Sequence, residues 1–571
     1  MTNEQIADML REIADILDIK GENPFKIRAY RRAVDAVKGL SEEVGKLYAE
    51  NRLLEIEGIG KGIAGHIDDL FRTGHMSFYE EARSSIPVGL LDILNVPGLG
   101  PKKVRLIWDK LGISTLDELE DAARHERLRA LPGLGAKSET SILAGIGIVR
   151  QGLERTTLGA ATRLADEIVD ALSGVPGIER VVPAGSLRRG RETIGDIDIL
   201  VVASDAELVM DRFVSMDVAA ETIARGPTKS SIRIKRGIQV DLRVVAAESF
   251  GAALVYFTGS KQHNVHLRSL ARKHNLKVSE YGVFDGDGRN VAAGPAETDV
   301  YAALDMEFVP PEMREDTGEI EAALDHRVPR LIETADLRGE IHAHSTYSDG
   351  RNTIAEMAQA AADRGYEYIV ITDHSKSLTV AHGLDAGRLA DQADEIERVN
   401  ASMNGFRVFR GIEVDIMPDG SLDLDDDTLA ALDFVVASVH SRFRQSQDDM
   451  TRRICAAIEN PHVDAIGHPT GRLINRRPPY ELDIEQVMAA ALRTKTALEL
   501  NAHYSRLDLR DVHLRRAREL GVMITIATDA HVTHDLDMVR YGIATARRGW
   551  LEPQHVLNTR PLDEFMEWLN R

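Results

Sequence analysis

Seven apolar runs, each ending in a polar or metal-capable residue, recur between residue 337 and the C-terminus. Helical segments lie between most of them, and strands that alternate with helices form parallel sheets. Seven such units predict a closed (β/α) barrel, whose chemistry gathers at the C-terminal ends of the strands. The runs are residues 339–344, 368–374, 408–415, 434–440, 464–468, 497–501 and 522–531.

The ends of these runs carry nine residues that could bind metal ions. A His-x-His or Asp-x-His pair on a strand points both side chains the same way, and mixed imidazole and carboxylate ligands suit Mn²⁺, Zn²⁺ or Fe²⁺ better than Mg²⁺. We expect two or three such ions, able to polarise a phosphodiester and generate hydroxide. A structural metal scaffold remains an alternative, although closed structural sites usually have four ligands. The nine residues are His342, His344, Asp349, His374, Glu413, His440, His468, Asp529 and His531.

A second acidic cluster lies in an α+β segment upstream. Asp196 and Asp198 alternate along an otherwise apolar strand and therefore share one face. Asp241, on a later strand, could complete a three-carboxylate site for Mg²⁺ or Mn²⁺, ions that also bind substrate phosphates. Asp-x-Asp alone also fits an exposed acidic strand, but the Gly-Ser-x-Arg-Arg segment at 185–189 makes the pattern specific.

The first 150 residues read as helical and repeat a Gly-apolar-Gly turn three times. Paired glycines allow a tight turn, and the N-terminus of the next helix can bind a phosphate. One copy would fit an ordinary helical turn, but three copies with nearby lysines favour contact with a DNA backbone. The residues are Gly58, Gly60 and Lys61, then Gly98, Gly100, Lys102 and Lys103, then Gly133 and Gly135.

The acidic cluster and its Gly-Ser turn resemble the nucleotidyltransferase palm of family X DNA polymerases, the DNA polymerase beta group, and the glycine turns resemble helix-hairpin-helix motifs. The resemblance continues through Tyr256-Phe257-Thr258-Gly259-Ser260 and covers roughly residues 1–315. It implies metal binding by the three aspartates, triphosphate binding by Ser186, Arg189 and Gly195, and nucleotide contacts by Tyr256, Phe257, Gly259 and Asn264. It also implies that Arg268 faces the templating pair.

The C-terminal half resembles the PHP (polymerase and histidinol phosphatase) domain, and all nine ligand positions match. The resemblance implies a template-directed, gap-filling DNA repair polymerase joined to a metal-dependent 3′–5′ exonuclease, 3′-end-processing or abasic-site activity. A small-molecule phosphatase or a non-catalytic metal scaffold is the alternative for the second half. Loop arginines 442, 444, 472, 476 and 477 could contact a DNA strand or be solvated charges.

The expected architecture is multidomain: helical N-terminal domains, an α+β palm and thumb, and a seven-stranded PHP barrel. The expected boundaries are 1–82 (N-terminal helical domain), 83–152 (fingers-like helical domain), 153–246 (palm), 247–308 (thumb-like domain), 309–336 (linker) and 337–571 (PHP barrel).

One position departs from the family pattern. Members with 5′-deoxyribose-phosphate lyase activity use a lysine on the helix after the first hairpin, where this chain has His66. An imidazole cannot form the Schiff base, and Lys61 lies on a different turn, so we expect weak or absent lyase activity.

The composition of the chain restricts its cellular compartment and its binding partners. The net charge is −21, but the acidity lies mainly in the C-terminal half, so a local basic channel for DNA remains possible. The single cysteine fits a reducing compartment. No apolar run approaches the roughly 20 residues of a membrane span, and the first residues lack a secretory signal. We expect a cytoplasmic, nucleoid-associated monomer that acts on gapped or nicked double-stranded DNA and deoxynucleoside triphosphates.

Overall fold

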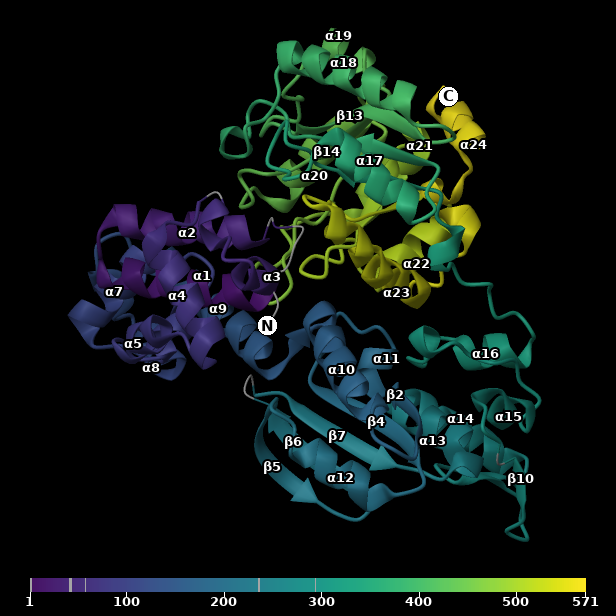
Figure 1. Ribbon diagram of the computed structural model, residues 1–571. Coiled ribbons are helices and arrows are strands. Elements are labelled where there is room, and N and C mark those ends of the chain that lie inside the picture. Colours follow the sequence, from purple (N-terminus) through teal and green to yellow (C-terminus); the bar gives the residue numbers. More distant parts are fainter. Residues whose placement is uncertain are drawn as a thin grey trace. The chain divides into compact units, whose positions relative to one another are not determined.

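The computed structural model describes residues 3–38, 40, 44–56, 58–234, 237–292 and 294–570 (Figure 1). It forms two compact units. One comprises residues 1–152 and 475–477, and the other comprises residues 153–474 and 478–571. Among the described residues, no helix has both the length and the apolar character needed to span a bilayer.

The first unit is helical, with one continuous core. In α1 the buried residues Ile6, Leu10, Ile13 and Leu17 recur at helical spacing, which places them on one face. The start of α8 is fixed by a capping box between Thr115 and Glu118. The helices are α1 (Asn3–Lys20), α2 (Pro24–Lys38), α3 (Val44–Ala49), α4 (Lys61–Thr73), α5 (Ser77–Ser84), α6 (Gly89–Leu94), α7 (Pro101–Leu111), α8 (Leu116–Arg124) and α9 (Ala136–Glu154).

The second unit begins with a five-stranded sheet in the order β2-β4-β7-β6-β5. Strands β4 and β7 are parallel, and the other neighbouring pairs are antiparallel. Residues Ile197, Ile199 and Val201 of β4 lie in a core cluster with α10 and α12, whereas Leu200 and Val202 of the opposite face pack with α13. The elements are α10 (Leu158–Ser173), β2 (Ile178–Pro183), α11 (Gly185–Arg188), β4 (Asp196–Ala203), α12 (Ala206–Val214), β5 (Ala219–Arg225), β6 (Lys229–Ile234) and β7 (Gln239–Val244), with the small pair β1 (Thr156–Thr157) and β3 (Thr193–Ile194).

A smaller helical layer with a three-stranded sheet follows. Its elements are α13 (Phe250–Thr258), α14 (Lys261–Lys273), β8 (Lys277–Ser279), β9 (Gly282–Phe284), β10 (Asn290–Ala292), α15 (Glu297–Ala302) and α16 (Glu319–Leu324).

The segment that the sequence places in a linker, 309–336, is folded over much of its length. Val309, Met313 and Ile320 belong to the same apolar cluster as α13 and α14. Arg314 is fully buried, and its Nη1 lies 2.7 Å from Glu297 Oε1. The prolines and acidic residues suggested a solvated connection, but Arg314, Glu315 and Glu319 are paired within the fold.

The C-terminal part is a nearly closed parallel barrel in the order β11 to β17, as the sequence predicts. A bridge between Ala343 and Ala530 links its first and last strands. Phe565 of α24 stacks on Tyr368 with ring centroids 4.4 Å apart, so α24 plugs the barrel at the N-terminal ends of the strands. The strands are β11 (Gly339–Ala343), β12 (Tyr368–Ile371), β13 (Arg407–Asp415), β14 (Phe434–Ser438), β15 (Ala465–Ile466), β16 (Ala497–Asn501) and β17 (Ile524–Ala527). The helices are α17 (Ile354–Asp363), α18 (Ala386–Ser402), α19 (Asp426–Ala430), α20 (Gln447–Ile458), α21 (Ile484–Thr494), α22 (Asp511–Leu520), α23 (Val539–Arg548) and α24 (Leu562–Leu569).

Within the second unit the barrel packs directly on the five-stranded sheet domain. Leu507 and Tyr541 of the barrel join the apolar cluster of β4 and α10. Arg472 Nη1 lies 2.7 Å from Glu192 Oε2, and Arg548 Nη1 donates a hydrogen bond to the carbonyl oxygen of Arg189. The sheet domain and the barrel are therefore joined by a shared apolar core, an ion pair and a hydrogen bond.

Candidate functional site

Three carboxylates converge on one face of the five-stranded sheet. Asp196 and Asp198 alternate on β4, and Asp241 of β7 is the register partner of Asp198. Burial, reinforced by the negative charges of Asp196 and Asp241, raises the pKa of Asp198 to about 6. Lys229 Nζ lies 3.1 Å from Asp241 Oδ2. Such a carboxylate set suits Mg²⁺ or a similar hard cation.

The turn between β2 and β4 lies against these carboxylates. Gly185 has φ of +61°, and a side chain there would bring its Cβ 2.5 Å from Asp198 Oδ2, so glycine is required. The next residue, Ser186, has a buried hydroxyl with no hydrogen-bond partner. An unpartnered hydroxyl beside an acidic cation site fits a phosphate that arrives together with the metal ion.

Arg189, expected to bind the triphosphate, is paired in this structure. Its Nε lies 3.1 Å from Glu315 Oε1, and its Nη1 donates to the carbonyl oxygen of Thr258. Gly195, also expected at the triphosphate, lines a polar depression together with Asp196 and Arg155.

The residues expected at the sugar and base lie on α13, on α14 and in the turn between them. Tyr256 and Phe257 lie in the last turn of α13 and are half-buried, and Asn264 Nδ2 donates to the Tyr256 carbonyl oxygen at 2.7 Å. Arg268 Nε donates to the Asn264 carbonyl oxygen at 3.1 Å. Gly259, at φ of +71°, allows the chain to pass close to Arg189.

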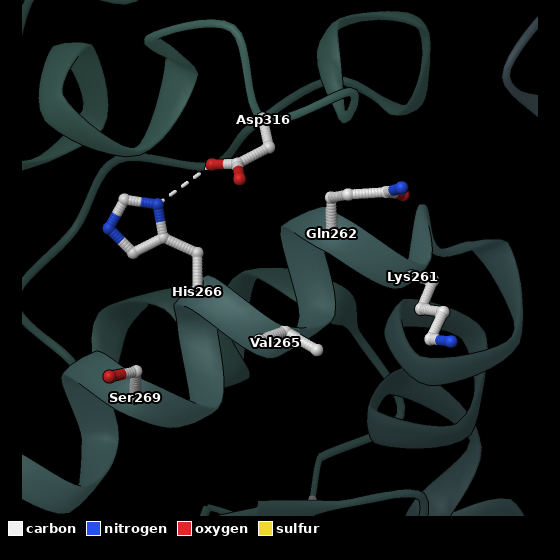
Figure 2. Close-up of a pocket in the computed structure, with 6 residues that line it drawn as sticks. All are labelled: Lys261, Gln262, Val265, His266, Ser269 and Asp316. Carbon is white, nitrogen blue, oxygen red and sulfur yellow. Dashed lines mark hydrogen bonds and ion pairs between the residues drawn. The ribbon is translucent and has the colours of Figure 1, made fainter.

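A second depression, along α14, contains none of the three carboxylates. Figure 2 shows its lining, in which Asp316 pairs with His266 at 2.8 Å. Among the lining residues, Lys261 carries a positive charge and Asp316 a negative one. The lining residues are Lys261, Gln262, Val265, His266, Ser269 and Asp316.

The three glycine turns have a common geometry. Gly58, Gly98 and Gly133 have positive φ values of 92°, 89° and 75°, and each turn is followed directly by α4, α7 or α9. A Cβ added at the second glycine of each turn, residue 60, 100 or 135, would meet no atom within 4 Å. Each helix start is thus open to a phosphate.

The lysines near these turns differ. Lys61 and Lys102 are exposed, whereas Lys103 Nζ donates to the Gly98 carbonyl oxygen at 3.0 Å and so braces its own turn. His66 stacks on Phe78 with ring centroids 4.5 Å apart, and burial lowers its pKa.

At the barrel, the structure brings the nine expected metal ligands together at the C-terminal ends of the strands. Three overlapping groups have ligand atoms within 4.8 Å of one another. They are His344, Asp349, His374 and His531; His342, His344 and Asp529; and His374, Glu413 and His440. The ninth residue, His468, places Nε2 3.0 Å from Glu413 Oε1.

A surrounding layer of carboxylates, which the sequence reasoning missed, orients these histidines. His342 Nδ1 donates to Glu499 Oε1 at 2.6 Å, and His440 Nδ1 donates to Asp415 Oδ1 at 2.8 Å. Each bond leaves the other ring nitrogen, Nε2, facing the cluster, as metal-binding histidines require. Asp415 follows Glu413 by two residues on β13, so strand alternation could have identified it.

Several buried atoms of these residues have no hydrogen-bond partner. They include His342 Nε2, His344 Nδ1 and His468 Nδ1, whereas His374 Nδ1 and Glu413 Oε2 lie 2.8 Å apart without hydrogen-bond geometry. Orphaned polar atoms gathered in one place are costly unless cations bind them. The donor set therefore fits a multi-metal centre.

The charge balance leads to the same conclusion. Burial acts to lower the pKa of His440, but Glu413 and Asp415 outweigh it and raise that pKa to about 10. Burial likewise acts to lower the pKa of His531, yet Asp349 and Asp529 raise that pKa to about 9. The carboxylates thus create a demand for positive charge that bound metal ions would meet.

The loop arginines divide into two kinds. Arg442 and Arg444 are exposed. Arg472 is buried, and its pairing with Glu192 makes it part of the contact with the sheet domain and not a strand-binding residue.

Together the folds and sites define a two-centre protein: a nucleotidyltransferase palm with its thumb, joined to a barrel that carries a cluster of potential metal ligands. Family models match residues 1–76 (helix-hairpin-helix domain), 90–147 (SAM-like helix-hairpin-helix tandem), 253–315 (DNA polymerase beta thumb) and 340–503 (PHP domain). The chain belongs to the family X DNA polymerases that carry a C-terminal PHP domain.

Full-length and partial relatives agree with this placement. The chain is 41% identical over 573 residues, covering 100% of both chains, to the DNA polymerase/3′-5′ exonuclease PolX of Bacillus subtilis. It is 25% identical over 344 residues to DNA polymerase lambda of Rattus norvegicus, covering 55% of this chain and 56% of that one. It is 34% identical over 233 residues to a Thermoanaerobacter protein named "Probable phosphatase", covering 38% of this chain and 89% of that one.

Proposed function

We propose that this chain fills gaps in damaged DNA by template-directed nucleotide addition and trims 3′ ends at its PHP centre. The observation that carries the proposal is the presence, in one chain, of a three-carboxylate cluster on adjacent strands and a separate nine-residue cluster of histidines and carboxylates. Gapped or nicked duplex DNA and deoxynucleoside triphosphates are its substrates, and it acts as a monomer.

At the polymerase centre, Asp196, Asp198 and Asp241 hold Mg²⁺ or Mn²⁺, which supplies positive charge to the triphosphate and to the attacking 3′-hydroxyl. Ser186 donates its free hydroxyl to a phosphate oxygen, and Arg189 exchanges Glu315 for the triphosphate. Tyr256, Phe257 and Asn264 contact the incoming nucleotide, Arg268 faces the templating pair, and the glycine turns hold the DNA backbone without reading sequence.

At the PHP centre, the nine ligands hold two or three Mn²⁺, Zn²⁺ or Fe²⁺ ions, which when bound polarise a phosphodiester and lower the pKa of water. Glu499 and Asp415 fix the ring orientation of His342 and His440. The functional division of the chain follows boundaries at residues 82, 152, 246 and 336, and the thumb extends past residue 308 into the following segment.

A second candidate function for the barrel is hydrolysis of small phosphate esters. It is favoured by the relatives named "Probable phosphatase", which match the barrel region alone. The two candidates differ in substrate, not in metal chemistry.

The test uses the full chain on a one-nucleotide-gapped duplex, with and without nucleotides, in Mg²⁺ and then in Mn²⁺. We expect extension with nucleotides and 3′–5′ shortening without them. Asp198→Asn should abolish extension and spare shortening, and His440→Gln should mainly impair shortening. Loss of both activities in either variant would contradict two separate centres. Phosphate release from small esters without strand shortening would favour the phosphatase.

A further inference from the structure

Arg506 lies on the loop after β16, beside the metal ligands of the barrel. Its Nε is 3.7 Å from Asp529 Oδ2, and its side chain is 20% exposed. The Nη1 atom of the same guanidinium is shielded from solvent and has no hydrogen-bond partner. A buried cationic N–H without an acceptor is unfavourable, so the position calls for an acceptor that the folded chain does not supply.

Asp529 is not that acceptor. Its Oδ2 accepts a hydrogen bond from Asn501 Nδ2 at 3.1 Å, and its Oδ1 lies 3.1 Å from His344 Nε2, within the ligand cluster. A separation of 3.7 Å is too long for a hydrogen bond from Arg506. The positive charge of the Arg506 guanidinium therefore lies near the ligand cluster, while its Nη1 can still donate a hydrogen bond to another group.

The loop that carries Arg506 is held rigidly. Asn501 and Asp508 close it through two backbone hydrogen bonds, and the amides of Arg506 and Leu507 both donate to the His503 carbonyl oxygen. The Asp508 carboxylate accepts from the amide and hydroxyl of Thr470 at 3.0 and 2.8 Å. A donor on such a loop needs little reorganisation when a substrate arrives.

We propose that Arg506 is a catalytic residue of the PHP centre and donates hydrogen bonds to a non-bridging oxygen of the scissile phosphate. The inference rests on the proposed phosphoester cleavage. Water adds to phosphorus, the bond from phosphorus to the 3′-oxygen breaks, and that oxygen leaves with a proton as a 3′-hydroxyl. The products are the shortened strand and a nucleoside 5′-monophosphate. Arg506 keeps its protons throughout and stabilises the negative charge that grows on the phosphate oxygens.

The test compares Arg506→Met and Arg506→Lys with Arg516→Met, an exposed arginine of α22 that pairs with Glu485. Single-turnover shortening of a 5′-labelled single strand in Mn²⁺ should slow by about 10²–10³-fold in Arg506→Met, the usual effect of removing one transition-state donor. Arg506→Lys should be intermediate, and Arg516→Met unchanged. Bound Mn²⁺, measured on the purified protein, should equal wild type in all three, as should nucleotide addition.

Two further measurements distinguish a phosphate contact from a structural role. The inhibition constants of thymidine 5′-monophosphate and of inorganic phosphate should each rise at least tenfold in Arg506→Met. Hydrolysis of bis(p-nitrophenyl) phosphate is followed in parallel. If wild type cleaves this ester but not DNA, the exonuclease proposal fails while the role of Arg506 is still tested. Loss of bound Mn²⁺ in Arg506→Met, or a cleavage rate within twofold of wild type, would overturn the proposal.

Discussion

At the scale of single residues, Ser186 gives the most direct prediction for the polymerase centre. Its hydroxyl is buried, lacks a partner and lies in the turn that packs on Asp198. A hydrogen bond to a charged group contributes about 1.5–3 kcal/mol, so Ser186→Ala should lower kcat/KM for nucleotide addition by roughly 10–100-fold. Steady-state extension of a gapped duplex measures this.

The matched control is Ser204→Ala, an exposed serine whose hydroxyl meets only the Gly177 carbonyl oxygen. It should keep wild-type kcat/KM, and 3′–5′ shortening should be normal in both variants. Normal kcat/KM in Ser186→Ala would mean that the triphosphate lies elsewhere.

The surroundings of His263 predict that the stability of the thumb falls at acidic pH. Its buried ring donates from Nδ1 to Glu319 Oε1 at 2.7 Å and accepts at Nε2 from the Tyr301 hydroxyl at 3.0 Å. Burial and the positive charge of Arg314 lower the pKa of His263, whereas Glu319 and Asp316 act to raise it. The net effect is a pKa below 6.5. The unfolded chain therefore binds more protons, and the stability from His263 is full above pH 6.5 and is lost as the pH falls.

Glu319 acts in the same direction: burial raises its pKa, but the interaction with His263 and the backbone hydrogen bonds together outweigh burial and lower that pKa. Hydrogen exchange of residues 250–324, corrected for intrinsic rates, should therefore show less protection at pH 5 than at pH 7. His263→Gln should reduce this pH difference, and His266→Gln, which alters an exposed pair, should not. Equal protection at both pH values would contradict the assigned neutral ring.

At the scale of elements, the sequence predicted the strands of both centres because period-two alternation and strand-end residues are local signals. Asp196 and Asp198 had to share a face once they lay on one strand, and the register with Asp241 added the third carboxylate. Glu499 escaped prediction because an acidic residue on a barrel strand gives no local sign that it will bind His342 from 157 residues away.

The glycine turns give a prediction that separates folding from DNA binding. Gly100 occupies the N-cap of α7 with φ of −97° and ψ of 172°, a conformation that any residue adopts, with open space around its Cβ. Aspartate is a good N-cap, so Gly100→Asp should fold normally. Its charge would repel a phosphate at the helix start, and affinity for a gapped duplex should fall about fivefold to tenfold at low salt.

Gly100→Ser keeps the cap without the charge and should bind DNA more tightly than Gly100→Asp. Gly98→Ala is the contrasting variant, because φ of +89° costs a residue with a Cβ about 1–2 kcal/mol. It should lower the melting temperature, whereas the Gly100 variants should not. Fluorescence anisotropy and thermal melts measure the two effects. Equal DNA affinity of the Gly100→Asp and Gly100→Ser variants would show that no DNA phosphate binds at this turn.

At the scale of the whole molecule, contacts between distant segments limited what the sequence could predict. Arg189 looked free for a triphosphate, yet it pairs with Glu315, 126 residues away. Residues 309–336 looked like a linker because proline and acidic residues usually lie in solvent, but Glu315 pairs with Arg189 and Arg314 pairs with Glu297 inside the fold. Such pairings depend on which elements the tertiary fold brings together, which local patterns do not specify.

The pairing of Arg189 connects the barrel to the nucleotide site. Glu315 lies 3.1 Å from Arg189, 3.5 Å from Arg191 and 2.8 Å from Arg548 of α23. Arg548 is almost fully buried and is balanced on its other side by Asp511 at 2.7 Å. Removing the charge of Arg548 would leave Glu315 to hold Arg189 more strongly, so that Arg189 exchanges less readily to a triphosphate.

Arg548→Met should therefore raise KM for nucleotides several-fold, about 1 kcal/mol or somewhat more, while Mn²⁺-dependent strand shortening stays unchanged. Adding Glu315→Gln to Arg548→Met should return KM toward wild type, because the amide no longer competes for Arg189. A general loosening of the fold would instead make the double variant worse than the single one. An unchanged KM in Arg548→Met would show that the barrel supports the palm without tuning its nucleotide site.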